Sequence, residues 1–503
     1  MTTNDRNVSR RQFLAWGLGG VIGMSVLTAC GQSAPAAPAP AKDAKPSGAA
    51  PAAGAAATTA PAAAQQAAPA KTSSKENISL RYLTTESDPP SQKVYNEALA
   101  EFTTANPNIK VEMEYIGFDA RTEKIVTGIG AKRAPHITQL TGYEVIEYGR
   151  LGFLASTKDL IAETGGAERW QPNSLAAVSS SNGDYFGAPY AGGSYRTLWY
   201  WKPEFDKAGL QPPKNWDEWK KVSETLTKDG KFGVSLPGGK NRWTTGNYVR
   251  FLWQTGETFF DENFNVTFGK EGAVKAMEVY RDLVKFGPPG FASYSYTESI
   301  DAFVSGQAMT QIYAGRTLGR VNDSKPAEVE TARGAKMPAG PIGGDVGPVN
   351  WDNYSIFNEK VGVSPAEQEA AKKLLKHMIT GKTATNFALT VPGHLLPPHL
   401  DTLKDPNLWE GHPLMKSHKA EIEWMYNGEN ALQYFTDAGA KITAEKVTPG
   451  QLNPYWPTIE SSLVIATMVQ RCLVQNESPK AAVEWGATEM KRLVEEAKAK
   501  MKR

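Results

Sequence analysis

Hydrophobic and polar residues alternate over residues 78–83 and again over residues 109–115, which is the period-two pattern of β-strands. Between them, residues 91–107 place apolar side chains at helical spacing and stop at an Asn-Pro pair. Residues 122–140 add a further helix and strand. A pattern that switches from strand to helix and back is typical of βαβ units, so the sequence predicts a parallel sheet covered by helices.

Helical patterns continue along the rest of the chain. Residues 364–381 form the clearest predicted helix, because Ser364 and Glu367 have the spacing of a capping box. A second helix is predicted at residues 215–226, with Trp219 expected in the core. Similar spacing predicts helices at residues 457–475 and 479–502. Alternating helices and strands without a fixed-period repeat favour an α/β protein over a solenoid or an all-β fold.

Length and charge narrow this picture. At 503 residues the chain is too long for one simple core, so two lobes are expected. The formal charge is +2, and Arg6, Arg10 and Arg11 against Asp5 account for all of it, which leaves 52 basic and 52 acidic residues elsewhere. This balance gives no support for a nucleic-acid partner. Of the two cysteines, Cys30 lies in the leader segment, and no disulfide or metal framework can be built from a single further thiol. Cys472 is expected to be a small buried residue.

The first 30 residues have the layout of an export signal. Arg10 and Arg11 precede a short, glycine-rich apolar run that is too short for a membrane-spanning helix. The arginine pair resembles a twin-arginine signal, and the Leu-Thr-Ala-Cys sequence that ends at Cys30 resembles a bacterial lipobox. We therefore expect lipidation at Cys30 and a lipid-anchored location outside the cytoplasm, either in the periplasm or at the cell surface.

The segment after Cys30 is expected to be a disordered tether. Residues 31–70 contain 20 alanines and 7 prolines and no Val, Ile, Leu, Met or aromatic residue. Such a segment cannot bury enough apolar surface to offset the entropy of ordering it. Residues 31–77 would therefore let the folded part move above a membrane.

Residues 78–503 contain a series of motifs: EFTTANPNIKVEMEY (101–115), GRLGFLASTKDL (149–160), FGAPYAGGSYRTLWYWKPEFDKAGLQPPKNWDEW (186–219), FVSGQAMTQIYAGR (303–316), AKMPAGPIGG (335–344), the predicted helix at 364–381 and VPGHLLP (391–397). In this order they resemble successive motifs of the bacterial extracellular solute-binding proteins. Within that family the chain most resembles the carbohydrate-binding proteins of ABC importers, relatives of maltose-binding protein. The chain departs from the family pattern at His136 and at Tyr200-Trp201.

The resemblance implies a periplasmic-binding-protein-like type II fold: two α/β lobes with a ligand cleft and multiple crossover segments. Lobe 1 would comprise residues 78–188 and 355–398, and lobe 2 residues 189–354 and 399–503. Crossovers are expected near residues 189–193, 349–354 and 393–400. The resemblance further implies a carbohydrate ligand, a membrane permease with a cytoplasmic ATPase as partners, no cofactor and a monomeric, non-enzymatic protein.

Ligands of open α/β sheets gather at the carboxyl ends of strands, so the loops there supply candidate ligand-binding residues. A sugar ring needs flat aromatic platforms for its C–H face and charged partners for its hydroxyl groups. The candidates are Glu86, Asp88, Tyr143, Glu144, Tyr190, Arg196, Trp243, Trp253, Tyr313, Arg316, Trp351, Asp352 and Tyr354.

Other functions stay open at this point. A polyamine would need several carboxylates around an aromatic box, and a phosphorylated polyol would favour convergence of Arg196 and Arg316; a peptide is a further alternative. A secreted glycoside hydrolase is a further alternative, since carboxylates are plentiful enough to supply the pair it needs. It is a remote one, because the ordered motifs resemble those of a binding protein. The spacings His394/His399 and His412/His418 do not form a metal motif, and hydrolase and NTPase motifs are missing.

Overall fold

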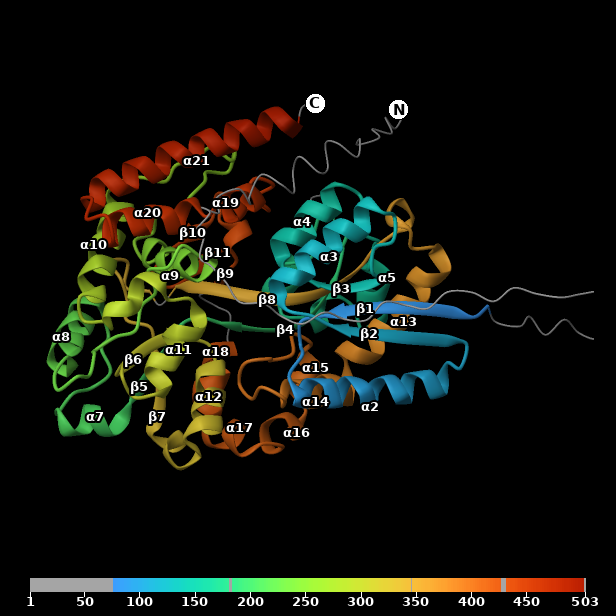
Figure 1. Cartoon of the computed structure of the whole chain (residues 1–503), viewed down its shortest axis with the longest axis horizontal. Coiled ribbons are helices and arrows are strands. Elements are labelled where there is room, and N and C mark those ends of the chain that lie inside the picture. Colours follow the sequence, from blue (N-terminus) through green and yellow to red (C-terminus); the bar gives the residue numbers. More distant parts are fainter. Residues whose placement is uncertain (1–75, 181–182, 345, 427–430, 502–503) are drawn as a thin grey trace, which may run out of the picture.

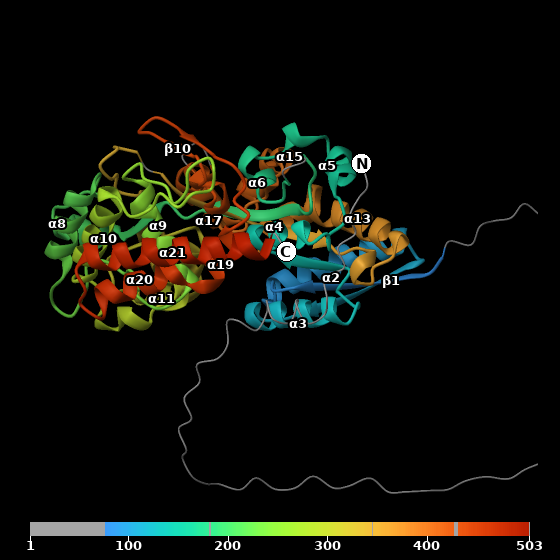
Figure 2. The same ribbon diagram turned by 90° about the horizontal axis from the view of Figure 1, so that it is seen from above.

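The computed structural model describes residues 76–180, 183–344, 346–426 and 431–501. Arg10, Arg11 and Cys30, and all but the end of the predicted tether, lie outside the described residues. The described chain forms two lobes that lie side by side and are joined by long strands (Figures 1 and 2). Each lobe has its own large cluster of buried apolar side chains.

Lobe 1 is built on a mixed sheet in which β1 pairs in parallel with β2 and β3. The full strand order is β2-β1-β3-β8-β4, with β9 also paired to β8, where β4 spans Ala188–Ser194, β8 spans Gly347–Ile356 and β9 spans Ala431–Leu432. Ile78 lies opposite Ile109, as the predicted βαβ pattern requires. Its elements are β1 (Ile78–Thr84), α2 (Pro89–Ala105), β2 (Ile109–Tyr115), α3 (Phe118–Gly130), β3 (Ile137–Leu140), α4 (Gly142–Arg150), α5 (Lys158–Glu163), α6 (Pro172–Ala176), α13 (Pro365–Ile379) and α14 (Gly381–Ala388).

Lobe 2 surrounds a small antiparallel sheet of order β6-β5-β7 with many helices. The long C-terminal helix α21 lies along its outer side (Figure 1). The strands and helices in residues 197–336 are β5 (Thr197–Trp201), α7 (Lys202–Lys207), α8 (Trp216–Leu226), α9 (Arg242–Trp253), α10 (Glu271–Val284), α11 (Tyr296–Val304), β6 (Thr310–Tyr313), α12 (Arg316–Ser324) and β7 (Ala332–Lys336). Those after residue 399 are α15 (Leu400–Leu403), α16 (Pro406–Glu410), α17 (Pro413–Ser417), α18 (Lys419–Tyr426), β9 (Ala431–Leu432), β10 (Lys441–Ile442), β11 (Val447–Thr448), α19 (Trp456–Ser462), α20 (Val464–Leu473) and α21 (Pro479–Met501). Short 3-10 turns occupy Ala167–Arg169, Pro289–Ser293, Pro326–Thr331, Glu359–Val361 and Tyr434–Thr436.

Three segments connect the lobes. The strands β4 (Ala188–Ser194) and β8 (Gly347–Ile356) run antiparallel to each other across the junction. The third segment follows α14, and Leu396 in it forms a bridge to Gly192 of β4. One buried cluster draws on residues 80–191 and 354–395, and the other, apart from Ala177, on residues 198–351 and 388–494. The cores therefore separate at the crossing segments.

Local sequence signals account for several of these elements. The capping box at the start of α13 is present, since Ser364 and Glu367 bond each other's backbone N–H groups. Helix α8 begins similarly, with the Asn215 side chain accepting from a backbone N–H 2.9 Å away. Trp219 and Cys472 are both buried, as their helical spacing predicts.

Candidate functional site

Strand β4 contains an irregularity at the junction between the lobes. Pro189 lies opposite Asn353 and Ala191 opposite Asp352, so Tyr190 is an extra residue between them. A bulge of this kind bends a strand and redirects a side chain, and bulges are common beside functional sites. The Tyr190 ring stacks on Tyr354 with ring centres 4.1 Å apart. The Tyr190 side chain on the crossing strand β4 is therefore held in place by its stacking on Tyr354.

Glu86 follows β1 and lies against this tyrosine. The Tyr190 hydroxyl donates to the Glu86 carboxylate at 2.7 Å, and the Gln139 amide lies 3.4 Å from the same oxygen. Burial raises the pKa of Glu86, while the Tyr190 hydrogen bond and the positive charge of Arg316 oppose that rise. Glu86 belongs to lobe 1 and Arg316 begins α12 of lobe 2. Their charges therefore interact across the junction.

Asp352 is the second carboxyl group at the junction. It lies in the middle of β8, opposite Ala191 of β4. Burial, together with the nearby Glu86 charge, raises the pKa of Asp352 to about 7, against the opposing effect of the Arg121 and Arg316 charges. A carboxyl group with this pKa can accept hydrogen bonds when ionised and donate one when protonated. Asp352 is thus a versatile hydrogen-bonding group.

Aromatic side chains of lobe 2 surround these charged groups. The Trp243 ring lies 4.8 Å from that of Tyr313 and 5.9 Å from that of Tyr195, and the Tyr195 and Tyr313 rings are 5.2 Å apart. The charges of Asp352 and Arg316 influence the pKa of both Tyr195 and Tyr313. Aromatic faces and charged groups therefore meet in one place.

A close backbone contact brings the third crossing segment to the same place. A Cβ atom on Gly315 would lie 2.0 Å from the carbonyl oxygen of Gly393, so only glycine fits there. Gly393 has a φ of +76°, which also favours glycine. The next residue, His394, has its ring 6.0 Å from Tyr313 and nearly parallel to it. Burial and the Arg316 charge keep the pKa of His394 well below its ordinary value, so it is neutral.

We define the interlobe site by the residues that these contacts join: Glu86, Tyr190, Tyr195, Trp243, Tyr313, Arg316, Asp352 and His394. Two of their buried atoms have no hydrogen-bond partner within the described part of the chain, the Trp243 Nε1 and the His394 Nδ1. Buried polar atoms are normally paired, so these two stand out as polar atoms that the described fold leaves without a partner. The site combines aromatic faces with charged and neutral hydrogen-bonding groups.

Two predicted residues from lobe 1 have other partners. The Asp88 carboxylate caps α2 by accepting from the Ser91 backbone N–H at 2.9 Å. Both Glu144 oxygens accept from the buried Arg121 guanidinium, at 2.7 and 2.8 Å, and Glu144 also forms a capping box with Thr141. The structure thus places both carboxylates in helix caps. The Thr-x-x-Glu spacing of that second cap is visible in the sequence.

Three further predicted residues have partners outside the interlobe site. Arg196 is buried with its guanidinium 5.2 Å from the Trp424 ring. Trp253 is fully buried, and its indole N–H donates to Asp437 at 2.6 Å. The Trp351 indole N–H donates to Asn173 at 3.1 Å. The structure does not bring these three side chains into the interlobe site.

Tyr143 takes part in a separate contact between the lobes. It lies on α4, and the Arg242 guanidinium of α9 is 4.8 Å from its ring centre. Arg242 is also 3.7 Å from Glu460 of α19. Burial raises the pKa of Glu460 to about 7. This contact holds lobe 1 against lobe 2 beside the site.

The sequence reasoning missed Tyr195, His394 and Arg250. Arg250 is fully buried, with its guanidinium 4.7 Å from the Trp243 ring centre and 5.9 Å from that of Tyr195. The available signal was spacing: Arg250 follows Trp243 by seven residues, which places both on one face of α9. Tyr195 and His394 could have been found as neighbours of the predicted crossings.

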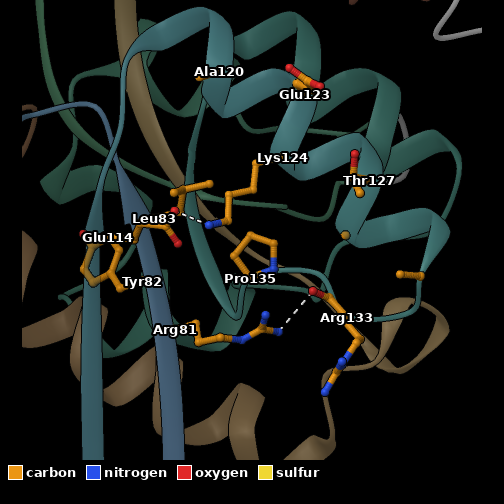
Figure 3. Close-up of a pocket in the computed structure, with 12 residues that line it drawn as sticks. Arg81, Tyr82, Leu83, Glu114, Ala120, Glu123, Lys124, Thr127, Arg133 and Pro135 are labelled. Carbon is orange, nitrogen blue, oxygen red and sulfur yellow. Dashed lines mark hydrogen bonds and ion pairs between the residues drawn. The ribbon is translucent and has the colours of Figure 1, made fainter. Parts of the chain in front are cut away.

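Two cavities lie away from the interlobe site. One, of about 390 Å³, lies between α3 and the outer part of the lobe 1 sheet, where Arg81 reaches the Arg133 carbonyl and Lys124 pairs with Glu114 (Figure 3). The other, of about 940 Å³, lies beside α14 and includes His399. Neither is lined by a residue of the interlobe site. Among the described residues, no group of three or more His, Cys, Asp or Glu side chains is placed to hold a metal ion.

Residues 86–384 match the model of the bacterial extracellular solute-binding protein family, which is more than half of the chain. The chain belongs to this family. It is 25% identical over 336 residues to the Escherichia coli K12 protein named "Putative ABC transporter periplasmic-binding protein YcjN", covering 65% of this chain and 74% of that one. The family places this solute-binding protein of ABC transporters outside the cytoplasm. In the described residues no helix combines the length and the apolar character needed to cross a bilayer.

Solved structures give the fold. Maltose-bound MalE3 of T. maritima superimposes with a TM-score of 0.69 at 21% identity, covering 83% of this solute-binding protein and 100% of that chain. A solute-binding protein of Thermotoga lettingae TMO with bound α-D-tagatose gives a TM-score of 0.66 at 21% identity, covering 83% and 99%. The fold is therefore that of the type II periplasmic binding proteins, as the sequence predicts.

Proposed function

We propose that this solute-binding protein captures an uncharged carbohydrate or polyol in the interlobe site and delivers it to an ABC permease. The observation that carries the proposal is the convergence of Trp243, Tyr195 and Tyr313 from lobe 2 with Glu86 from lobe 1, joined by Arg316 and Asp352. A sugar presents an apolar C–H face and a rim of hydroxyl groups. Aromatic rings suit the face, and charged groups form strong hydrogen bonds with the rim. The sugars bound by the solved relatives support this class of ligand.

Delivery would depend on lobe closure. A ligand can favour closure only by contacts that exist in the closed state and are absent in the open one. The interlobe site would supply such contacts, because Glu86 comes from lobe 1 whereas Trp243 and Arg316 come from lobe 2. The bulged strand β4 and strand β8 would carry the bending.

The geometry favours this proposal over the other solutes. A polyamine would require an excess of carboxylates, but Arg316 and Arg250 offset Glu86 and Asp352. A phosphorylated polyol would require Arg196 and Arg316 together, and Arg196 instead stacks on Trp424.

We further propose that the protein acts as a binder without catalysis. The Glu86 charge raises the pKa of Asp352, so these two neighbouring carboxyl groups are the pair that a glycosidase would use here. Glu86 is engaged by Tyr190, which leaves it poorly placed as a proton donor to a glycosidic oxygen. Incubation with the bound sugar followed by chromatography tests this directly. Recovery of unchanged sugar is expected, and hydrolysis would contradict the proposal.

We also propose that the protein is a monomer tethered to the membrane. Export would use Arg10 and Arg11, the lipid would be attached to Cys30, and residues 31–77 would form the tether. A tether of this length spans roughly 40 Å as a flexible chain. Lobe 1 would comprise residues 78–188 and 355–398, and lobe 2 residues 189–354 and 399–503.

A thermal-shift screen tests the ligand class. The purified protein is heated with monosaccharides, disaccharides, polyols, polyamines and glycerophosphates in parallel. A ligand at 100 times its Kd stabilises the folded protein by about 2.7 kcal/mol, which is a clear shift in Tm. Stabilisation by neutral sugars or polyols is expected. Stabilisation by amines or phosphates alone would contradict the proposal.

A further inference from the structure

Arg250 lies directly behind the aromatic part of the interlobe site. It is on α9, fully buried, and its guanidinium is 4.7 Å from the Trp243 ring centre. Tyr195 is the second aromatic neighbour, at 5.9 Å. A guanidinium at these distances from ring faces makes cation–π contacts. One side of the aromatic group is thus occupied by a positive charge.

This charge lacks a carboxylate partner among the described residues. One terminal nitrogen of Arg250 donates to the Asn247 side chain at 2.5 Å, while Nε and the other terminal nitrogen have no hydrogen-bond partner there. Burial lowers the pKa of Arg250, and the groups that oppose this most are tyrosines, whose own pKa values burial raises, so that they stay neutral. An unpaired buried charge is costly to keep. Its retention calls for a functional reason.

The balance of charges in the interlobe site supplies a functional reason to retain the Arg250 charge. Glu86 and Asp352 are two acidic groups, and Arg316 is one basic group interacting with both. Without Arg250 the two acidic groups would outnumber the one basic group, and above the Asp352 pKa of about 7, where both are ionised, the site would suit a cation. With Arg250 the acidic and basic groups are equal in number. The faces of the Trp243 and Tyr195 rings would otherwise attract a cationic ligand, but the Arg250 guanidinium already lies against them.

We propose that Arg250 sets the charge selectivity of the interlobe site by rejecting positively charged ligands such as amino sugars. This inference rests on the proposed function, because it assumes that the ligand lies against Trp243. A unit charge about 8 Å from Arg250, at an effective dielectric constant of about 20, changes affinity by roughly 30-fold. Arg250 should therefore weaken the binding of an ammonium-bearing sugar and favour that of its carboxylate counterpart.

The test uses matched sugars that differ in charge. Calorimetry on the purified full chain measures Kd for D-glucose, D-glucosamine and D-glucuronate, and for the corresponding galactose and mannose series. The variants are Arg250→Met, which removes the charge, and Arg250→Lys, which keeps it. Arg471→Met is the matched control, because Arg471 stacks on Trp485 at 4.6 Å in the outer part of lobe 2.

The inference predicts a specific pattern. The unaltered chain should bind the neutral sugar at least 10-fold more tightly than the amine. Arg250→Met should strengthen the binding of the amine relative to the neutral sugar by about 30-fold and weaken the binding of the carboxylate by a similar factor. Arg250→Lys and Arg471→Met should keep the original order of affinities.

Other outcomes separate the two proposals. If no neutral sugar binds the unaltered chain, the proposed function fails, and this inference fails with it. If neutral sugars bind but Arg250→Met changes the affinities of all three charge types equally, only the charge-selectivity inference is overturned. Should Arg250→Met not fold, equal affinity of the unaltered chain for glucosamine and glucose overturns the inference by itself.

Discussion

Replacement of Trp243 by alanine is the sharpest perturbation of the proposed ligand platform. The indole is partly buried, with the Tyr313 ring 4.8 Å and the Arg250 guanidinium 4.7 Å from its ring centre. Burial of two or three C–H groups of the sugar against the indole contributes about 2 kcal/mol to binding, at about 0.8 kcal/mol for each buried CH₂. Loss of the ring-specific contact adds about 1 kcal/mol. Trp243→Ala should therefore raise Kd by about 100-fold.

Calorimetric titration with the sugar that stabilises the protein most measures this change. Trp243→Phe keeps an aromatic face and should raise Kd by less than 10-fold. Trp485→Ala is the matched control, because Trp485 is also partly buried and also stacked by an arginine, at 4.6 Å, but lies in α21. Affinity that is unchanged in Trp243→Ala, or that falls equally in Trp485→Ala, would refute the placement of the ligand.

Three further results are expected. Asp437→Ala should lower the free energy of unfolding by about 3 kcal/mol in urea denaturation, because the Trp253 indole and the Phe259 backbone N–H, at 2.6 and 2.7 Å, lose their acceptor; a loss below 1 kcal/mol would contradict that role. Burial raises the pKa of Glu460 to about 7, so the folded state holds a proton that the unfolded state releases above about pH 4.5, and stability falls as pH rises from about 5 to 7. Glu460→Gln should flatten the dependence of Tm on pH over that window, and an unchanged slope would argue against it. Cys30→Ala should release the protein from membranes into the soluble fraction on cell fractionation, and continued membrane retention of this variant after signal cleavage would contradict the anchor.

Much of the fold could be predicted because its signals are local. The period-two strands beginning at Ile78 and Ile109 occupy neighbouring positions in the sheet, and the Ser364 cap begins α13. Each of these depends on residues only a few positions apart. The arrangement of the crossing strands depends on long-range pairing, and the sequence supplied it only through the family resemblance.

The interlobe site could be predicted only in part. Glu86 and Arg316 were found because both follow strands, where ligands of α/β sheets gather. Asp88 and Glu144 follow strands as well, but short-range helix caps use their carboxylates. Loop position therefore cannot distinguish a ligand-binding carboxylate from a capping one. Arg250 lies inside a helix, and its contact with Trp243 needed the spacing along α9 to be considered.

Small-angle scattering with and without ligand tests the central claim most directly. The claim is that Glu86 of lobe 1 and Trp243 of lobe 2 hold one ligand between them, so the bound protein should be more compact than the free one. At a saturating concentration of a stabilising neutral sugar, the radius of gyration of the purified protein should decrease. A radius of gyration that stays the same while calorimetry shows full occupancy would contradict the account.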